Sequence, residues 1–199
     1  VIPLGGSSWL GAVGYVGAGL ELAAQVEAGE IYAPARIYMA TGTMGSAGGL
    51  ALGLALAGLQ SEVQAVRGSP EEIMNPPRLD HLMAKTASML NSLDPGIPAD
   101  LHRRARIEVR HDFFAGGYAR SDAATAAAID VARDALGLDL ESTYTGKAMA
   151  ALLHDAGQPR HRDEFLMFWN TYNSNPLPEI QESAIDMALL PEDFLRYFD

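Results

Sequence analysis

The stretch ATGTMGSAGGLALGLALAGL, residues 40–59, follows a strand-like run at residues 35–39 (ARIYM). It turns through several glycines and continues as an unbroken apolar run at residues 47–59. Glycines let consecutive backbone N–H groups converge, and the first N–H groups of a helix have no partner within it. Together with the helix dipole, these donors suit a phosphate group, to which Thr41, Thr43 and Ser46 would add hydroxyls. The stretch therefore predicts either a phosphate-binding turn or a tight turn into a close-packed helix.

Composition limits the kind of protein. The chain has 199 residues, 48% of them hydrophobic, which is enough to bury a sizeable core. Its net charge of −11 argues against binding of nucleic acid or of an anionic membrane surface. The absence of cysteine excludes disulfides, thiolate catalysis and cysteine-ligated metals. The longest apolar run is too short and too rich in glycine to span a membrane, and no signal peptide is recognisable, so a soluble cytoplasmic protein is expected.

Strands and helices alternate along the sequence. A βαβ unit is expected from the strands at residues 35–39 and 62–66, which would be parallel and joined right-handed. The same pattern predicts an α/β fold, a mostly parallel sheet with helices on both faces, in a single domain over residues 1–199. A tail at residues 176–199 would dock as a helix on the body or on a partner subunit. Further strands are predicted at residues 1–4, 105–109 and 164–169, and further helices at residues 10–28, 79–93, 122–136 and 146–156.

Other chemical signals are weak. The five histidines show no metal-ligand spacing, so no metal site is expected. Ser7 and Ser46 have no recognisable histidine and aspartate partners for nucleophilic catalysis.

Several segments, in order, resemble one enzyme family. IPLGGSSWLGAVGYVGAGLELAAQ (residues 2–25) resembles the IPxGGSNxxGxxGY segment of D-cysteine desulfhydrases and 1-aminocyclopropane-1-carboxylate (ACC) deaminases. ATGTMGSAGGLALGL (residues 40–54) resembles the loop with which these enzymes bind the phosphate of pyridoxal 5′-phosphate (PLP). GY (117–118), YTGKAM (144–149) and FLMFWNT (165–171) resemble later family segments. The resemblance covers nearly all of residues 1–175 and implies the large domain of a fold type II, tryptophan synthase β-like PLP enzyme.

The resemblance implies roles for individual residues. Thr145 would face the pyridine nitrogen of PLP, where the deaminases have a carboxylate. A neutral hydroxyl there would leave that nitrogen largely unprotonated, which favours a D-cysteine desulfhydrase-like β-elimination over opening of a cyclopropane ring. Tyr118 and Tyr144 would be catalytic and line the pocket for a small amino acid, although spacing alone favours a core role for Tyr144. The phosphate would be bound by Gly42, Thr43, Met44, Gly45 and Ser46.

The sequence also departs from the family pattern. Residues 141–143 (EST) replace DPV, residues 170–173 (NTYN) replace HTGG, and Ala119 replaces a glycine. Neither of the two lysines, Lys85 and Lys147, matches the Schiff-base lysine of the family, which lies upstream of the matched segments. Because this lysine is missing, and because the chain begins without methionine in what reads as a strand, we expect the C-terminal portion of such an enzyme. Alone it would be inactive and would expose a sheet edge.

Other interpretations remain open. The chain could be an ACC deaminase portion, or a non-catalytic homologue whose tail and sheet edge serve assembly. It could also be an NADP-binding Rossmann-like domain, with pyrophosphate at residues 42–48 and the 2′-phosphate at Arg67 and Ser69. The spacing G-x-x-G-x-x-G differs from the G-x-G-x-x-G fingerprint, which counts against that last alternative. A homodimer is implied by the resemblance only.

Overall fold

Four parallel strands form a single sheet in the computed structural model, which describes residues 1–173, 189 and 191. The order across the sheet is β3-β2-β1-β4, and each neighbouring pair runs parallel. The central pair is in register from Arg36 opposite Glu62 to Thr41 opposite Arg67. The strands are β1 (Arg36–Thr41), β2 (Glu62–Arg67), β3 (Ile107–Arg110) and β4 (Leu166–Phe168).

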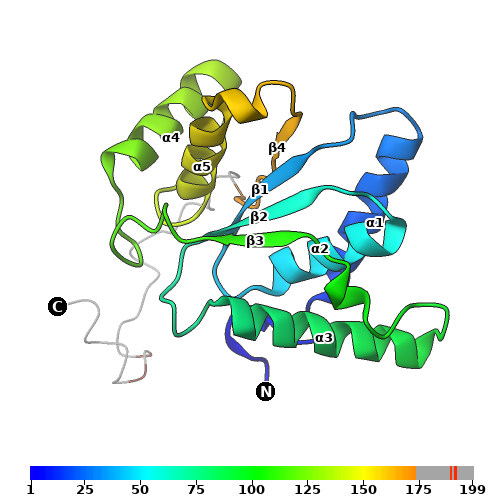
Figure 1. Ribbon diagram of the computed structural model, residues 1–199. Coiled ribbons are helices and arrows are strands. Elements are labelled where there is room, and N and C mark those ends of the chain that lie inside the picture. Colours follow the sequence, from blue (N-terminus) through cyan, green and yellow to red (C-terminus); the bar gives the residue numbers. More distant parts are fainter. Residues whose placement is uncertain (174–188, 190, 192–199) are drawn as a thin grey trace.

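Helices cover both faces of this sheet, as the sequence predicted (Figure 1). Ile37 and Met39 of β1 pack in the larger core with α1, α2 and α3, whereas Tyr38, between them, packs against α5. Alternate residues of a strand point to opposite faces, so the central strands must be apolar on both. The helices are α1 (Val13–Glu27), α2 (Gly45–Ala57), α3 (Pro76–Leu93), α4 (Ala123–Leu136) and α5 (Thr145–Ala156).

Helix α2 is apolar on every side and is buried between the sheet and α1. The two helices cross so closely that a Cβ atom at Gly53 would overlap the carbonyl oxygen of Val16, and one at Gly49 would overlap that of Ala12. Gly19 of α1 also approaches α2 closely, as predicted, whereas Gly14 and Gly17 of the same helix have no neighbour within 4 Å of a Cβ position. The contact between α1 and α2 fixes the position of the loop at the start of α2.

Several expected boundaries were wrong. Residues 1–3 form no strand, and Leu4–Gly6 is a short 3-10 helix, because Gly5 and Gly6 adopt left-handed backbone angles and no strand lies alongside. Helix α1 begins at Val13 instead of residue 10, since Ser8 Oγ accepts a hydrogen bond from the Gly11 N–H in a preceding turn. Helix α3 begins at Pro76 instead of residue 79.

The start of α3 has a local explanation. Asn75 caps the helix by accepting a hydrogen bond from the Arg78 N–H, and both prolines occupy the first turn. A proline there loses no hydrogen bond, because the first N–H groups of a helix have no partner within it. The last strand is shorter than predicted, with three half-buried residues. The expected docking of residues 176–199 falls outside the described residues, apart from Leu189 and Pro191.

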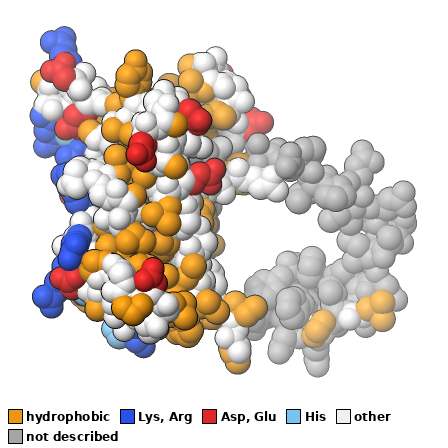
Figure 2. Space-filling view, turned by 90° about the vertical axis from the view of Figure 1, so that its right-hand side faces the viewer, with side chains coloured by type: hydrophobic (Ala, Val, Ile, Leu, Met, Phe, Trp, Pro, Cys, Tyr) orange, Lys and Arg blue, Asp and Glu red, His pale blue; other side chains and the backbone are white. Residues whose placement is uncertain are grey.

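On the face shown in Figure 2, hydrophobic side chains form a broad band, and Lys and Arg side chains lie along one margin. Exposed apolar residues in the described part of the chain include Trp9, Leu10 and Leu20. No helix in that part is long and apolar enough to cross a membrane.

Candidate functional site

A cavity of about 540 Å³ lies where β1 and β2 end, at the start of α2. Small-molecule sites typically have volumes of roughly 300–1,000 Å³, and the carboxyl ends of parallel strands are their usual place. The cavity brings together all five residues predicted to bind phosphate and both predicted catalytic tyrosines. Its lining includes Ser7, Gly42, Thr43, Met44, Gly45, Ser46, Ser69, Tyr118 and Tyr144.

The loop between β1 and α2 is shaped by two serines from other segments. Ser7 Oγ accepts a hydrogen bond from the Gly45 N–H (3.0 Å) and donates one to Thr43 Oγ1 (2.7 Å). Ser69 Oγ donates to the Gly42 carbonyl (2.6 Å). A Cβ atom at Gly45 would lie 2.7 Å from Ser7 Oγ, so this approach requires glycine. The loop is therefore held in one shape from both sides.

The same loop offers free hydrogen-bond donors. Met44, which precedes α2, has the left-handed φ of 75°, and the N–H groups of Ser46 and Ala47 find no acceptor among the described residues. Such N–H groups at a helix start bind anions. No charged side chain lines the cavity in the described part of the chain, so an anion there would be held by backbone dipoles and hydroxyls. These residues fit the phosphate of PLP.

Tyr144 lies across the ends of the two central strands. Its ring packs against Gly42 and Gly68, and the ring of Tyr118 meets it edge-on, with centroids 6.0 Å apart. Burial, together with the hydrogen bond to Tyr118 and the charge of Glu141, raises the pKa of Tyr144 to about 12. The Tyr144 hydroxyl is therefore protonated at neutral pH.

Thr145 lies outside the main cavity, in a neighbouring one of about 330 Å³ that Tyr118 and Tyr144 also line. Its hydroxyl donates to Glu141 Oε1 (3.1 Å) and accepts a hydrogen bond from the Glu141 N–H (3.2 Å). Because its proton is directed to the carboxylate, this hydroxyl has only a lone pair left for a ligand. Tyr172, which stands in the family's glycine segment, lines the same smaller cavity.

Neither lysine lines the main cavity. Lys147 is fully buried and donates to the carbonyls of Phe114 (2.9 Å) and Gly117 (3.1 Å), while Lys85 is exposed on α3 beside a separate cavity. This arrangement agrees with the expectation that neither is the Schiff-base lysine.

The structure does not support Arg67 as the residue that would bind the 2′-phosphate of NADP in the Rossmann-like alternative. Arg67 is only 8% exposed, its guanidinium lies 4.0 Å from the centroid of the Phe114 ring, and Nη1 donates to the Ser69 carbonyl. It is therefore not available to a ligand in the cavity.

Sequence reasoning missed several functional contacts. Ser7 was considered only as a nucleophile, and the roles of Gly68 and of the Glu141 carboxylate were not predicted. The GS pair at residues 68–69, directly after β2, was a visible signal, because binding residues are often carried by loops that a rigid scaffold positions. Within the described residues, no group of three or more histidine, aspartate or glutamate side chains could hold a metal ion.

Comparison with known proteins gives the family. No family model matches the chain. A D-cysteine desulfhydrase of Klebsiella pneumoniae subsp. pneumoniae is 35% identical over 164 residues, covering 82% of this chain and 47% of the relative. One from Klebsiella pneumoniae strain 342 is 37% identical over 165 residues, with the same two coverages, and one from Salmonella paratyphi B is 35% identical over 164 residues.

A solved structure, titled as an analysis of the ACC deaminase homologue, matches the fold with a TM-score of 0.65. It is 24% identical, and the match covers 84% of this chain and 47% of that one. The α/β fold agrees with the resemblance seen in the sequence. This chain is a homologue of the D-cysteine desulfhydrase and ACC deaminase family that spans about half the length of the curated relatives it matches.

Proposed function

We propose that this chain forms the phosphate-binding and tyrosine-bearing portion of a PLP-dependent lyase that resembles D-cysteine desulfhydrase. The observation that carries the proposal is the single cavity in which the loop at residues 42–46 faces Tyr118 and Tyr144. The overall reaction of the whole enzyme would convert D-cysteine and water to pyruvate, ammonia and sulfide. When bound, PLP would supply an electron sink for negative charge at the substrate α-carbon.

The loop would bind and orient the cofactor through its phosphate. The N–H groups of Ser46 and Ala47 are free, and Ser7 and Ser69 hold the loop so that little reorganisation is needed on binding. A preorganised set of donors binds more tightly than a mobile one, because fewer groups must be ordered.

The two tyrosines would act on the substrate side. Tyr144 is protonated at neutral pH and packs against Tyr118, whose side chain is 55% exposed and lines the cavity. The Tyr118 hydroxyl would donate a hydrogen bond to the substrate or transfer its proton, and Tyr144 would hold it in place.

One observation favours the ACC deaminase alternative. The carboxylate of Glu141 lies directly behind Thr145 and accepts the proton of its hydroxyl. If the Thr145 hydroxyl contacts the pyridine nitrogen, it can only accept a hydrogen bond from it. A pyridine nitrogen that donates a hydrogen bond must be protonated. The carboxylate of the deaminases would favour the same protonated state. The relatives at 35–37% identity favour the desulfhydrase, and we retain it as the main proposal.

A PLP titration followed by tryptophan fluorescence tests the proposal. Trp9 lines a cavity that shares Ser7, Thr43 and Met44 with the main one, so its emission should report binding at the loop. We expect saturable quenching by PLP, binding about tenfold or more weaker for pyridoxal, which lacks the phosphate, and competition by inorganic phosphate. Equal binding of pyridoxal and PLP would refute the phosphate-site assignment.

The state of the lysines is tested in the same samples. Borohydride should not fix PLP to Lys147, which is buried away from the cavity. Lys85 is exposed beside a different cavity, so any PLP fixed there should be that of an ordinary surface lysine and should not follow saturation of the loop. PLP fixed at Lys147, or turnover of D-cysteine by this chain alone, would show that the chemistry does not require a lysine from elsewhere.

A further inference from the structure

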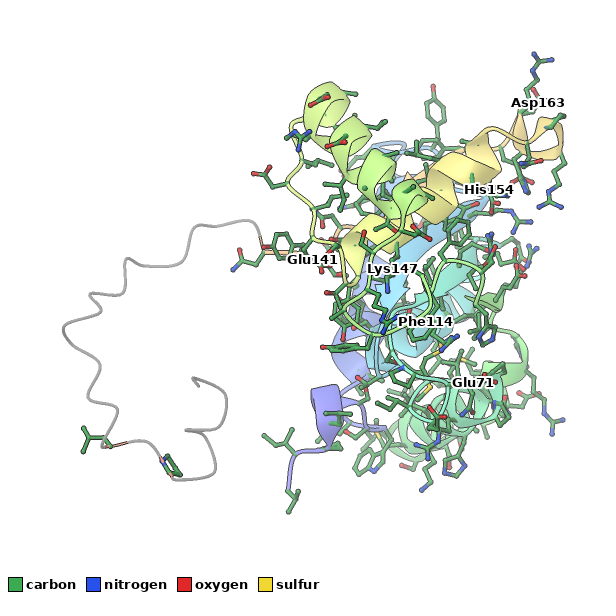
Figure 3. All side chains as sticks on the ribbon, turned by 90° about the vertical axis from the view of Figure 1, so that its left-hand side faces the viewer. Glu71, Phe114, Glu141, Lys147, His154 and Asp163 are labelled. Atoms are coloured by element: carbon green, nitrogen blue, oxygen red, sulfur yellow. The ribbon has the colours of Figure 1, made fainter. Side chains whose placement is uncertain are left out.

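Lys147 is a buried charge for which the proposed function has no use. The residue is fully buried at the start of α5, and its ammonium group donates to two backbone carbonyls, those of Phe114 and Gly117. Figure 3 shows Lys147 and Phe114 next to each other. Nζ also lies 5.2 Å from the centroid of the Phe114 ring.

No carboxylate in the described residues forms an ion pair with this ammonium group. Burial lowers the pKa of Lys147, and the more distant charges of Asp122 and Glu141 oppose that shift. Taking an ammonium ion out of water costs several kcal/mol, and two carbonyls compensate it less completely than a carboxylate would. The hydrogen bonds of Lys147 to the two carbonyls therefore only partly offset the cost of burying its charge.

Both carbonyls belong to the segment that connects β3 to α4 and carries Tyr118. This segment contains two alanines with left-handed φ, Ala115 and Ala119, each at 56°. Such angles are unfavourable for a residue with a Cβ atom. The backbone hydrogen bonds within the segment are long, 3.3 Å from Phe114 N to the His111 carbonyl and 3.4 Å from Gly117 N to the Phe114 carbonyl. Its own hydrogen bonds therefore hold the segment weakly.

Helix α5 supplies two attachment points for this segment within one turn. Tyr144, the residue before the helix, meets the ring of Tyr118, and Lys147 binds the carbonyl of Gly117, the residue before Tyr118. On the other side, the Arg67 guanidinium lies over the ring of Phe114. The position of Tyr118 is thus set by its own ring contact with Tyr144 and by the contacts of Phe114 and Gly117, which precede it in the chain.

We propose that Lys147 is a positioning residue, which fixes the segment at residues 113–120 and thereby holds the Tyr118 hydroxyl at the cavity beside Tyr144. The role of Tyr118 in the reaction rests on the proposed function. The fixing of residues 113–120 by Lys147, which we call the clamp, does not. The clamp acts through the two carbonyls, so a side chain at this position must reach them and donate two hydrogen bonds.

The test compares Lys147→Met with Lys147→Arg, and uses Lys85→Met, which removes the other lysine, as the matched control. Hydrogen exchange of the peptide covering residues 113–120 reports the segment, and NMR of ring-labelled tyrosine, assigned with Tyr118→Phe and Tyr144→Phe, reports the two hydroxyls. We expect Lys147→Met to speed exchange in this segment about tenfold or more, while peptides of α1 and α2 exchange as in the unmodified chain. The Tyr118 resonance should shift, because its ring would leave the edge-on contact with the ring of Tyr144.

Lys147→Arg should restore much of the protection, because it keeps the charge and two or more donors, and Lys85→Met should change neither readout. A folded Lys147→Met variant with unchanged exchange and tyrosine resonances would overturn the proposal. If the Lys147→Met variant does not fold, NMR of the unmodified chain tests the proposal instead. The Lys147 ammonium protons should give a slowly exchanging resonance with cross-peaks to Gly117 and Tyr118. Absence of these cross-peaks would overturn the proposal. PLP affinity is measured separately. Failure of the clamp proposal would appear in the exchange and tyrosine data, whereas failure of the proposed function would appear in the PLP titration.

Discussion

The ring of Tyr144 lies directly against Gly68, so that a Cβ atom at Gly68 would stand 2.5 Å from Cδ1 of the tyrosine. Gly68 follows β2 and Gly42 follows β1, and these strands are in register at their last residues. The ring thus rests on two glycines side by side, with no other side chain between it and the ends of the strands. The contact between Tyr144 and Tyr118 depends on this packing of the Tyr144 ring against the two glycines.

Gly68→Ala should displace Tyr144, since the added methyl group overlaps its ring. Removed from its buried position, Tyr144 should titrate nearer to its ordinary pKa of 10.0 than to about 12. Ultraviolet titration of the tyrosines, with Tyr144→Phe to identify the signal, measures the change. Gly14→Ala is the control, because a Cβ atom there meets nothing within 4 Å. An unchanged Tyr144 titration in Gly68→Ala would contradict the packing.

Gly45→Ala should weaken phosphate and PLP binding by about tenfold, equivalent to about 1.4 kcal/mol. The methyl group would press on Ser7 Oγ and break its hydrogen bond with the Gly45 N–H, which shapes the loop. Fluorescence titration measures the affinity. The matched change Gly17→Ala meets no neighbour and should leave binding intact, while stabilising α1 by up to about 1 kcal/mol.

Asp155→Asn should destabilise the chain by about 3 kcal/mol, because Asp155 accepts hydrogen bonds from Arg110 (2.6 Å) and Tyr38 (2.8 Å) in the interior. Asp112 also pairs with Arg110, but its side chain is 54% exposed, so Asp112→Asn should cost less than about 1 kcal/mol. Urea unfolding measures both. Equal losses for the two variants would contradict the assignment of Asp155 as the principal partner.

The same pair predicts a dependence of stability on pH. Burial alone would raise the pKa of Asp155, but the hydrogen bonds from Arg110 and Tyr38 outweigh it and hold the pKa below its ordinary value of 3.8. Asp155 therefore binds protons less readily in the folded state than in the unfolded state. Its contribution should be complete above pH 3.8 and be lost as the pH falls through the lower folded-state pKa. Asp155→Asn should remove this part of the acid dependence, as urea unfolding across that range would show.

Glu141→Ala should destabilise α5 by about 1–2 kcal/mol. The Glu141 carboxylate accepts hydrogen bonds from the N–H groups of Thr143 (2.6 Å), Tyr144 (2.8 Å) and Thr145 (2.6 Å). The control is Asp122→Ala, which removes the corresponding cap of α4 and should cost a similar free energy of unfolding without moving the tyrosines. Tyrosine NMR distinguishes the two: a resonance shift in both variants, or in neither, would count against a local role for Glu141.

Local sequence signals predicted the elements that depend on local interactions. Asp122 caps α4 by accepting from the Thr125 N–H, and Gly137 follows the helix with a φ of 63°, so the helix lies close to the bounds expected at residues 122–136. The glycine-rich turn into α2 was equally visible, because its residues lie next to one another in the chain. The strand expected at residues 1–4 failed because a strand needs a neighbour to pair with, and no local signal supplies one.

The site was predicted less completely, for the same physical reason. The phosphate loop and the tyrosines came from motifs, whereas the hydrogen bond between Ser7 and Gly45 joins residues 38 positions apart. Lys147 presented a different difficulty. A lysine in the first turn of a helix is ordinarily exposed, and its burial depends on a segment about thirty residues earlier that folds over it.

The interlocked glycines of α1 and α2 have a consequence for thermodynamics. Neither helix can slide or rotate past the other without the backbones colliding, so the loop before α2 is carried on a unit that moves as one body. The entropy lost in ordering that loop is then incurred when the chain folds and not when an anion arrives. Calorimetry of phosphate binding should accordingly show little of the entropic penalty that a disordered loop would impose, and the affinity should decline only when the helix pair itself melts.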